Sequence, residues 1–154
     1  GGVIVTNRHL LEDAGSLTVT FPGRGSCRIT GWSISALADL GLIYLTGDNL
    51  PFVELEKEQP PEVGDNVLII GNPLNYSRIA MSGKITGYRR LDGCPAPVLE
   101  IDVPVHGGSS GSPVFNANGK VVAVIFAALD DGSEGDIGGL ALPVGLLDDF
   151  LQEQ

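Results

Sequence analysis

The sequence predicts an all-β protein that ends in a short helix. It contains 22 glycines and 10 prolines, which are spread between short apolar runs instead of being gathered in one linker. Such a composition is typical of many short strands joined by turns. Several runs alternate apolar and polar residues, which is the period of half-buried strands. Apolar residues follow a helical spacing only near the C terminus, over residues 144–151.

The expected strands are defined by their apolar residues and by the turn residues that bound them. In chain order they cover residues 3–5, 17–21, 29–34, 67–70, 98–101 and 121–126. A further short strand, Val114-Phe115, precedes Asn118-Gly119, a dipeptide that strongly favours a tight hairpin turn. We therefore expect this strand to fold straight back onto the one that follows. The proline-stiffened segment 59–62 predicts a crossing between two halves of the chain.

Composition and charge exclude several classes of function. Hydrophobic residues make up 43% of the 154 residues and charged residues 18%, so we expect one ordered core and no disorder. The net charge of −10, with only nine Lys and Arg residues, excludes nucleic-acid binding, which needs clustered basic residues. No apolar run approaches the roughly 18 residues that indicate a membrane-spanning helix. The sequence does not open with a signal peptide either, although this does not place the protein in the cytosol.

A glycine-rich turn has the composition expected around a serine nucleophile. It reads Gly107-Gly108-Ser109-Ser110-Gly111-Ser112-Pro113 and leads into an apolar strand. Glycine lets the backbone fold where a side chain would clash, so that two N–H groups can point at one spot. The oxygen of a tetrahedral intermediate would carry its negative charge at that spot.

Upstream of this turn lie a histidine and an aspartate in suitable contexts. His9 follows an apolar strand where the chain becomes polar and turns, and Asp39 is a lone acid among apolar residues. A serine hydroxyl needs a neighbouring base, and a buried carboxylate needs a partner. The other histidine, His106, lies in the same loop as Ser110. We expect it at the rim of a pocket, either as a loop residue or as a substrate contact.

In these motifs the chain resembles the trypsin-like serine proteases, and most closely their HtrA/Deg branch. That branch carries a Thr-Asn-x-His turn, an Asp-Leu-x-Leu-Ile strand, an Ile-Gly-Asn-Pro segment, a Gly-x-Ser-Gly-Gly-Pro turn and a Gly-x-Ala-x-Pro strand before a closing helix. The similar segments here, in the same order, are residues 6–9, 39–43, 70–73, 108–113 and 139–143. The resemblance therefore covers about the whole chain.

The resemblance implies a single trypsin-like protease domain, without a PDZ domain, built from two packed six-stranded-type antiparallel β-barrels. Residues 1–58 would form the N-terminal barrel, residues 59–143 the C-terminal barrel and residues 144–154 a C-terminal helix. Only two glycines precede the strand that leads to His9, whereas the family has a further strand there. Either the chain is trimmed, or its first barrel is incomplete and leaves an open edge that recruits another strand.

The same resemblance implies a serine endopeptidase that works through a catalytic triad and an acyl-enzyme. Ser110 would attack the scissile carbonyl, His9 would act as base and then as acid, and Asp39 would orient His9. The oxyanion hole would use the backbone N–H groups of Gly108 and Ser110, with Ser109 between them.

The substrate pocket is predicted from the segments on either side of the nucleophile turn. By the resemblance, its walls would be Pro104, Val105, His106, Ile125, Phe126, Ala127 and Ala128. No acid stands at Pro104, where proteases specific for Arg or Lys carry one. An aliphatic wall favours small or medium apolar P1 residues such as Val, Ala or Leu. The preference would be broad, because one methylene group discriminates by only ~1–3 kcal/mol.

Other interpretations stay open at this point. One is a protease-fold binding module whose catalytic residues are present but silent, and another is a protease that needs a strand from a partner chain. A metal site from His9, His106, Cys27 and Cys94 has no support, because these residues lack the local spacing of metal ligands. No metal and no cofactor are therefore expected.

The expected partners are protein or peptide substrates, together with either further copies of the chain or a strand-donating partner. The resemblance alone places the protein outside the cytoplasm, in a periplasm or secreted, or in an organelle. Cys27 and Cys94 allow one disulfide at most and do not decide the compartment.

Overall fold

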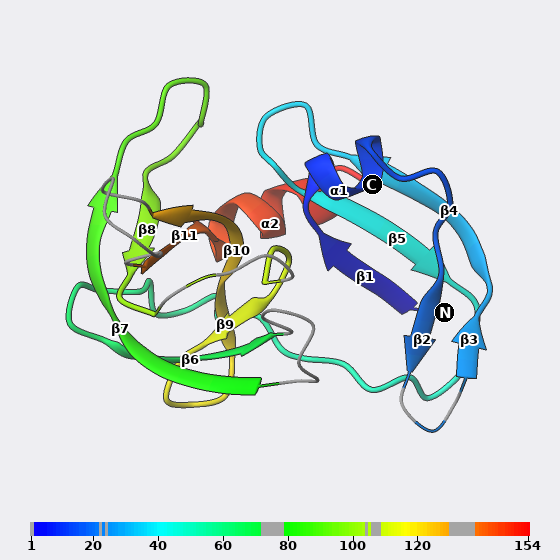
Figure 1. Cartoon of the computed structure of the whole chain (residues 1–154), viewed down its shortest axis with the longest axis horizontal. Coiled ribbons are helices and arrows are strands. Elements are labelled where there is room, and N and C mark those ends of the chain that lie inside the picture. The colour runs from blue at the N-terminus through cyan, green and yellow to red at the C-terminus, as the bar shows by residue number, and fades with distance from the viewer. Residues whose placement is uncertain are drawn as a thin grey trace. The chain divides into compact units, whose positions relative to one another are not determined.

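A computed structural model describes residues 2–21, 23, 25–71, 79–103, 105, 109–129 and 138–154 of the chain (Figure 1). The all-β architecture with a short C-terminal helix is confirmed. The chain divides into two compact units, Gly1–Phe52 and Val53–Gln154.

The N-terminal unit contains two small antiparallel sheets. Its elements are β1 (Gly2–Thr6), α1 (Arg8–Glu12), β2 (Val19–Phe21), β3 (Gly25–Cys27), β4 (Ile29–Ile34) and β5 (Gly41–Leu45). The larger sheet has the order β1-β5-β4, so β5 is its central strand, and β2 pairs with β3. Leu11 of α1 and Ile43 and Leu45 of β5 are buried together and form the core of this unit.

Within the described residues, neither sheet of the N-terminal unit closes into a ring, and β1 and β4 are edge strands of their sheet. Two local expectations differ from the structure. The polar segment after β1, expected as a turn, begins the helix α1, and β3 was not expected because Gly-Ser-Cys lacks alternation of apolar residues.

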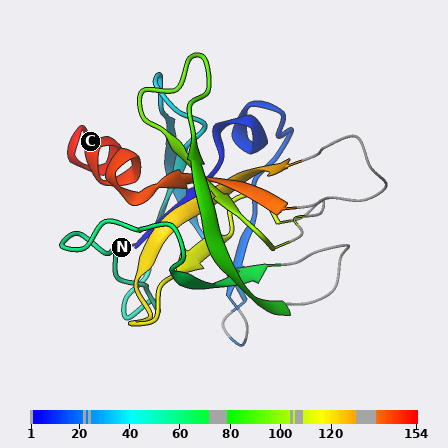
Figure 2. The same ribbon diagram turned by 90° about the vertical axis from the view of Figure 1, so that its left-hand side faces the viewer.

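The C-terminal unit contains a closed six-stranded barrel. Its strands are β6 (Asn66–Gly71), β7 (Ile79–Arg89), β8 (Val98–Ile101), β9 (Pro113–Phe115), β10 (Val121–Leu129) and β11 (Gly138–Pro143). They follow one another around the ring as β10-β11-β8-β7-β6-β9, and every pairing is antiparallel (Figure 2). Closure removes free edges, which is one way in which small β-proteins avoid unwanted strand pairing.

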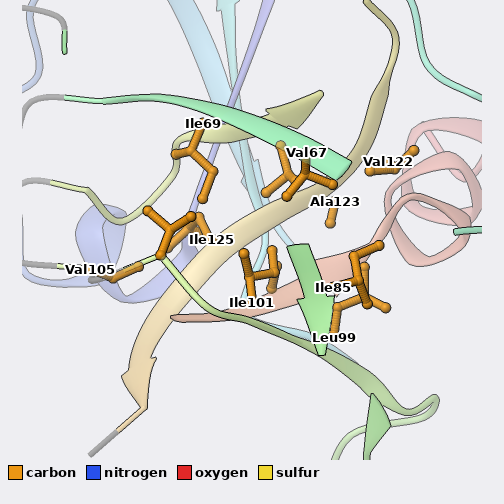
Figure 3. Packing of buried hydrophobic residues seen from close by; sticks show 12 residues of the cluster. Val67, Ile69, Ile85, Leu99, Ile101, Val105, Val122, Ala123 and Ile125 are labelled. Carbon is orange, nitrogen blue, oxygen red and sulfur yellow. The ribbon is translucent and has the colours of Figure 1, made fainter. Parts of the chain in front are cut away.

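Aliphatic side chains fill the barrel (Figure 3). On β6, Val67 and Ile69 are buried whereas the residues on either side of each are exposed, as the period of a strand requires. The buried cluster comprises Val67, Ile69, Ile85, Leu99, Ile101, Val103, Val105, Val114, Val122, Ala123, Ile125 and Ala141. This core fixes the barrel on which the predicted nucleophile turn is built.

The C-terminal helix α2 (Val144–Gln152) lies against β10 and β11. It buries Val144, Leu147 and Phe150, which share one face because they lie three residues apart. Lys57 Nζ and Asp148 Oδ1, 3.3 Å apart, form an ion pair beside the helix, in which the Asp148 side chain is partly buried. In the part of the chain that the structure describes, no helix is long and apolar enough to cross a membrane.

A buried carboxylate joins the segment before the barrel to the hairpin that follows β9. Glu56 is 4% exposed, and its backbone N–H donates to the carbonyl oxygen of Val121 at 2.9 Å. Its side chain accepts hydrogen bonds from the Asn116 amide at 3.0 Å and from the backbone N–H of Glu58 at 3.3 Å. Burial alone would raise the pKa of Glu56, but these two bonds and the charge of Lys120 outweigh it and lower the pKa below 4.5.

We expect Glu56 to make the stability of the C-terminal unit depend on pH in the acid range. Because the folded pKa lies below the unfolded one, the stabilisation is fully present above about pH 4.5 and is lost as the pH falls through the folded pKa. The Glu56→Gln variant should therefore show a smaller fall in its thermal unfolding midpoint than the wild type between about pH 7 and about pH 3. Equal falls in the two proteins would show that Glu56 does not contribute.

Candidate active site

The strand pairing of the N-terminal unit brings His9 and Asp39 together. β1 and β5 are antiparallel, with Thr6 opposite Gly41 at the end of the ladder (Figure 1). Residues that follow β1 therefore meet residues that precede β5. His9, the second residue of α1, and Asp39 meet there, with His9 Nδ1 and Asp39 Oδ2 2.6 Å apart.

Both carboxylate oxygens of Asp39 contact His9. Oδ2 faces the ring nitrogen Nδ1, and Oδ1 accepts the backbone N–H of His9 at 2.9 Å. A carboxylate can only accept, so the ring must carry its proton on Nδ1, which leaves the Nε2 lone pair free in the neutral imidazole. The His9 side chain is 44% exposed and that of Asp39 is 22% exposed, so the pair is open to solvent on the side of the ring.

The segment that carries Asp39 is held in place by its own hydrogen bonds. Ser35 Oγ accepts the backbone N–H groups of Leu37 and Ala38 at 3.1 and 3.2 Å. Arg8 of α1 donates from Nη1 to the carbonyl oxygen of Ser35 at 3.0 Å. The acid is therefore presented by a short hydrogen-bonded loop that is tied to the helix carrying His9.

Ser110 lies in a tight turn of the C-terminal unit, just before β9. Gly111 has a φ of +88°, a conformation that other residues rarely adopt. Its N–H donates to the carbonyl oxygen of Ile125 at 2.8 Å, and the N–H of Ile125 donates to the carbonyl oxygen of Ser112 at 3.0 Å. The N–H of Ser112 also closes the turn by donating to the carbonyl oxygen of Ser109 at 3.1 Å. The turn is therefore fastened to β10, with Ser110 partly exposed at its tip.

Gly71, the last residue of β6, lies against this turn. A Cβ atom at Gly71 would lie 2.8 Å from Ser112 Oγ and 3.6 Å from Ser109 Oγ. Ser109 is fully buried, and its hydroxyl has no hydrogen-bond partner in the part of the chain that the structure describes. The turn therefore uses the space that a side chain at position 71 would fill.

The structure locates some of the predicted substrate-binding residues. Val105 and Ile125 are buried in the barrel core, whereas Phe126 and Ala127 are half-buried and Ala128 is exposed on β10. The remaining predicted site residues, Pro104, His106 and Gly108, lie outside the described residues.

Two residues that sequence reasoning did not single out contact the predicted machinery. Asn7 donates from Nδ2 to the carbonyl oxygen of Asp39 at 3.0 Å, and Gly71 contacts the Ser110 turn. Both lie inside segments that resemble family motifs, the Thr-Asn-x-His turn and the Ile-Gly-Asn-Pro segment. Their roles depend on contacts between distant segments, which a motif does not specify.

Cys27 and Cys94 are free thiols, one in each unit. Among the residues whose positions the structure describes, no group of three or more His, Cys, Asp or Glu side chains could hold a metal ion.

The chain is similar to known proteases in sequence and in fold. The profile of the trypsin-like peptidase domain family matches residues 1–124. A protein from Pseudomonas putida named a probable periplasmic serine endoprotease DegP-like is 30% identical over 125 residues, which cover 80% of this chain and 26% of that protein. A protein of the same name from Chlamydia trachomatis is 32% identical over 148 residues, which cover 92% of this chain and 29% of that protein.

A solved structure gives the same result at the level of the fold. The serine endoprotease from Yersinia pestis superposes with a TM-score of 0.80 at 27% identity, and the match covers 99% of this chain and 53% of that one. The chain thus spans less than a third of the length of these two curated relatives. On the profile match, the ordered motifs and the barrel, the chain belongs to the trypsin-like peptidase family, in its HtrA/Deg branch.

Proposed function

We propose that this chain is the catalytic domain of a serine endopeptidase that hydrolyses peptide bonds in protein substrates. The observation that carries the proposal is the bond between His9 Nδ1 and Asp39 Oδ2, 2.6 Å long, in a chain of the trypsin-like peptidase family. This bond holds the imidazole in the tautomer that has a free lone pair on Nε2. A base of that kind is what a serine hydroxyl needs to become a nucleophile.

In the proposed reaction, the hydroxyl oxygen of Ser110 attacks the scissile carbonyl carbon while Nε2 of His9 takes the hydroxyl proton. The resulting imidazolium is stabilised by Asp39, and its proton passes to the leaving amine as the C–N bond breaks. Water then attacks the acyl-enzyme on Ser110 by the same route and releases the acid product. Backbone N–H groups of the turn from Gly108 through Ser109 to Ser110 stabilise the oxyanion in both halves.

The conformation of the turn around Ser110 supports this role. Its left-handed glycine and its two hydrogen-bonded connections to Ile125 keep the serine at the tip of a fixed turn. A fixed turn lets backbone donors act without reorganising during the reaction, which is the main source of their catalytic effect.

We further propose that the protein cleaves after small or medium apolar residues and acts outside the cytoplasm. Of the predicted pocket residues that the structure describes, those that are not buried in the barrel core, Phe126, Ala127 and Ala128, carry no charge. The two curated relatives described above are named periplasmic endoproteases, which supports the location.

A peptide-library cleavage profile tests the activity and the P1 preference together. We expect cleavage after Val, Ala or Leu to exceed cleavage after Lys, Arg or Asp, because an apolar wall leaves a charged P1 group buried without a partner. Cleavage mainly after a basic residue would contradict the proposed preference while leaving the activity intact. Absence of cleavage in every library member would contradict the proposed activity.

A further inference from the structure

Asn7 is completely buried at the junction of β1 and α1, but its side chain does not cap the helix. It occupies the N-cap position of α1 with φ −92° and ψ 148°, the extended backbone that N-cap residues adopt. Asparagine is favoured at this position because its side-chain oxygen accepts an N–H from the first turn. No such bond is made here, although Asn7 is 0% exposed.

The amide of Asn7 is used instead to hold the backbone of Asp39. Nδ2 donates to the carbonyl oxygen of Asp39 at 3.0 Å, and Oδ1 is buried with no hydrogen-bond partner among the described residues. A carbonyl oxygen can only accept, so the nitrogen of the amide must face it. A buried acceptor without a partner is unfavourable, and an apolar side chain of similar size would avoid that cost. What an amide contributes at this position is therefore the bond to Asp39.

Asp39 takes over the acceptor role that Asn7 leaves vacant. The backbone N–H of His9 is the second of α1, one of those that an N-cap side chain ordinarily accepts. It donates to Asp39 Oδ1 at 2.9 Å. Gly41 lets Leu11 of α1 pack against the start of β5, since a Cβ atom there would lie 2.6 Å from Leu11 Cδ1 and 3.5 Å from the Asn7 carbonyl oxygen. One acid thus holds both the backbone and the ring of His9, while Asn7 holds the acid.

We propose that Asn7 is a positioning residue that aims the carboxylate of Asp39 at Nδ1 of His9. Without the Asn7 amide, the carbonyl oxygen of Asp39 loses its hydrogen-bond donor. A residue at position 7 that caps α1 in the ordinary way would also compete with Asp39 Oδ1 for the backbone N–H of His9. Oδ1 of Asp39 would then lose its bond to the backbone of His9, and the carboxylate would be held only by the contact between Oδ2 and Nδ1. It could therefore rotate away from the imidazole ring. The inference concerns catalysis and so rests on the proposed function, but the geometry that it asserts can be measured without turnover.

The test is the Asn7→Ser variant of the full chain. Serine ranks with asparagine as an N-cap residue but is too short to donate to the Asp39 carbonyl. We expect kcat on a peptide substrate to fall by about 10- to 100-fold with KM unchanged, as a small misplacement of a catalytic group produces. We also expect the proton NMR resonance of His9 Nδ1–H, assigned with ¹⁵N-labelled histidine, to shift upfield or broaden as its bond to Asp39 weakens. The Asn7→Thr variant, which fills more of the buried space, provides the same test if the serine variant does not fold.

The matched control is Asn66→Ser, the same chemical change at an exposed position on β6. It should leave both kcat and the His9 resonance at their wild-type values. A folded Asn7→Ser protein with an unchanged resonance and unchanged kcat would overturn the proposal, even if its thermal unfolding midpoint fell, because Asn7 would then serve stability alone. If the wild type shows no turnover that depends on Ser110, the proposed function fails separately, and the resonance alone decides whether Asn7 positions the pair.

Discussion

The Ser110→Ala variant is expected to lose peptidase activity while keeping its fold. Removal of one oxygen atom deletes the nucleophile, and we expect kcat to fall by about 10⁶-fold, the loss that follows removal of the serine of such a triad. Residue 110 is partly exposed at the tip of its turn, and the bonds that fasten the turn to β10 come from backbone atoms of its neighbours. Hydrolysis of casein, with circular dichroism and thermal unfolding of the same samples, measures both parts of this prediction.

The control for this variant is Ser26→Ala, which makes the same change at an exposed serine of β3. It should hydrolyse casein at the wild-type rate. Equal activity of the Ser110→Ala protein and the wild type would exclude Ser110 as the nucleophile. A silent binding module, the alternative interpretation of the sequence, predicts no hydrolysis by any of the three proteins.

The Asp39→Asn variant is expected to lower kcat by about 10⁴-fold with little change in structure. Asparagine has the shape of aspartate, so its Oδ1 can still accept the backbone N–H of His9. Its NH₂ group, however, would face Nδ1 of the ring, where only an acceptor now stands. Nδ1 would then have to accept a hydrogen bond from that donor, so the ring would carry its proton on Nε2. In that tautomer Nε2 cannot take the proton of the serine. Steady-state kinetics on a peptide substrate measure the loss.

Asp48→Asn is the matched control for this substitution, because Asp48 is an exposed acid of the same unit. It should leave kcat unchanged. The Asp39→Asn/Ser110→Ala double variant should be no slower than Ser110→Ala alone, since residues that act as one catalytic unit are not additive. An Asp39→Asn protein with wild-type kcat would show that the acid only stabilises the loop.

Much of the fold could be predicted from the sequence because most strands carry a local pattern. The sequence of β4 alternates apolar and polar residues, and β6 is a short run of Val, Leu and Ile bounded by turn residues. Asn118-Gly119 marks the hairpin between β9 and β10. β7 could not be predicted in this way, because Gly83 and Gly87 interrupt its apolar side. Glycine is required at position 83 by the fold, since a Cβ atom there would lie 2.2 Å from Val103 Cγ2. That glycine is needed because of a contact with a segment distant in the sequence, so the residues around position 83 do not reveal the reason for it.

The candidate site shows the same division between local and distant information. The pairing of His9 with Asp39 could be predicted from motifs, and the register of β1 with β5 is its physical cause. The positioning role proposed for Asn7 could not be predicted from the sequence, because an asparagine before a helix ordinarily indicates an N-cap. Its side chain donates instead to a residue that is 32 positions away in the sequence.

The measurement that tests the proposed triad most directly is labelling by a fluorophosphonate, followed by peptide mapping. The reagent phosphonylates an activated serine hydroxyl with loss of fluoride, so it reports activation of Ser110 by His9 without requiring a good substrate. We predict rapid, stoichiometric labelling at Ser110 in the wild type and almost none in the His9→Ala variant. Labelling at Ser110 that proceeds equally fast in both proteins, or a wild type that remains unlabelled, would contradict a catalytic link between the two side chains.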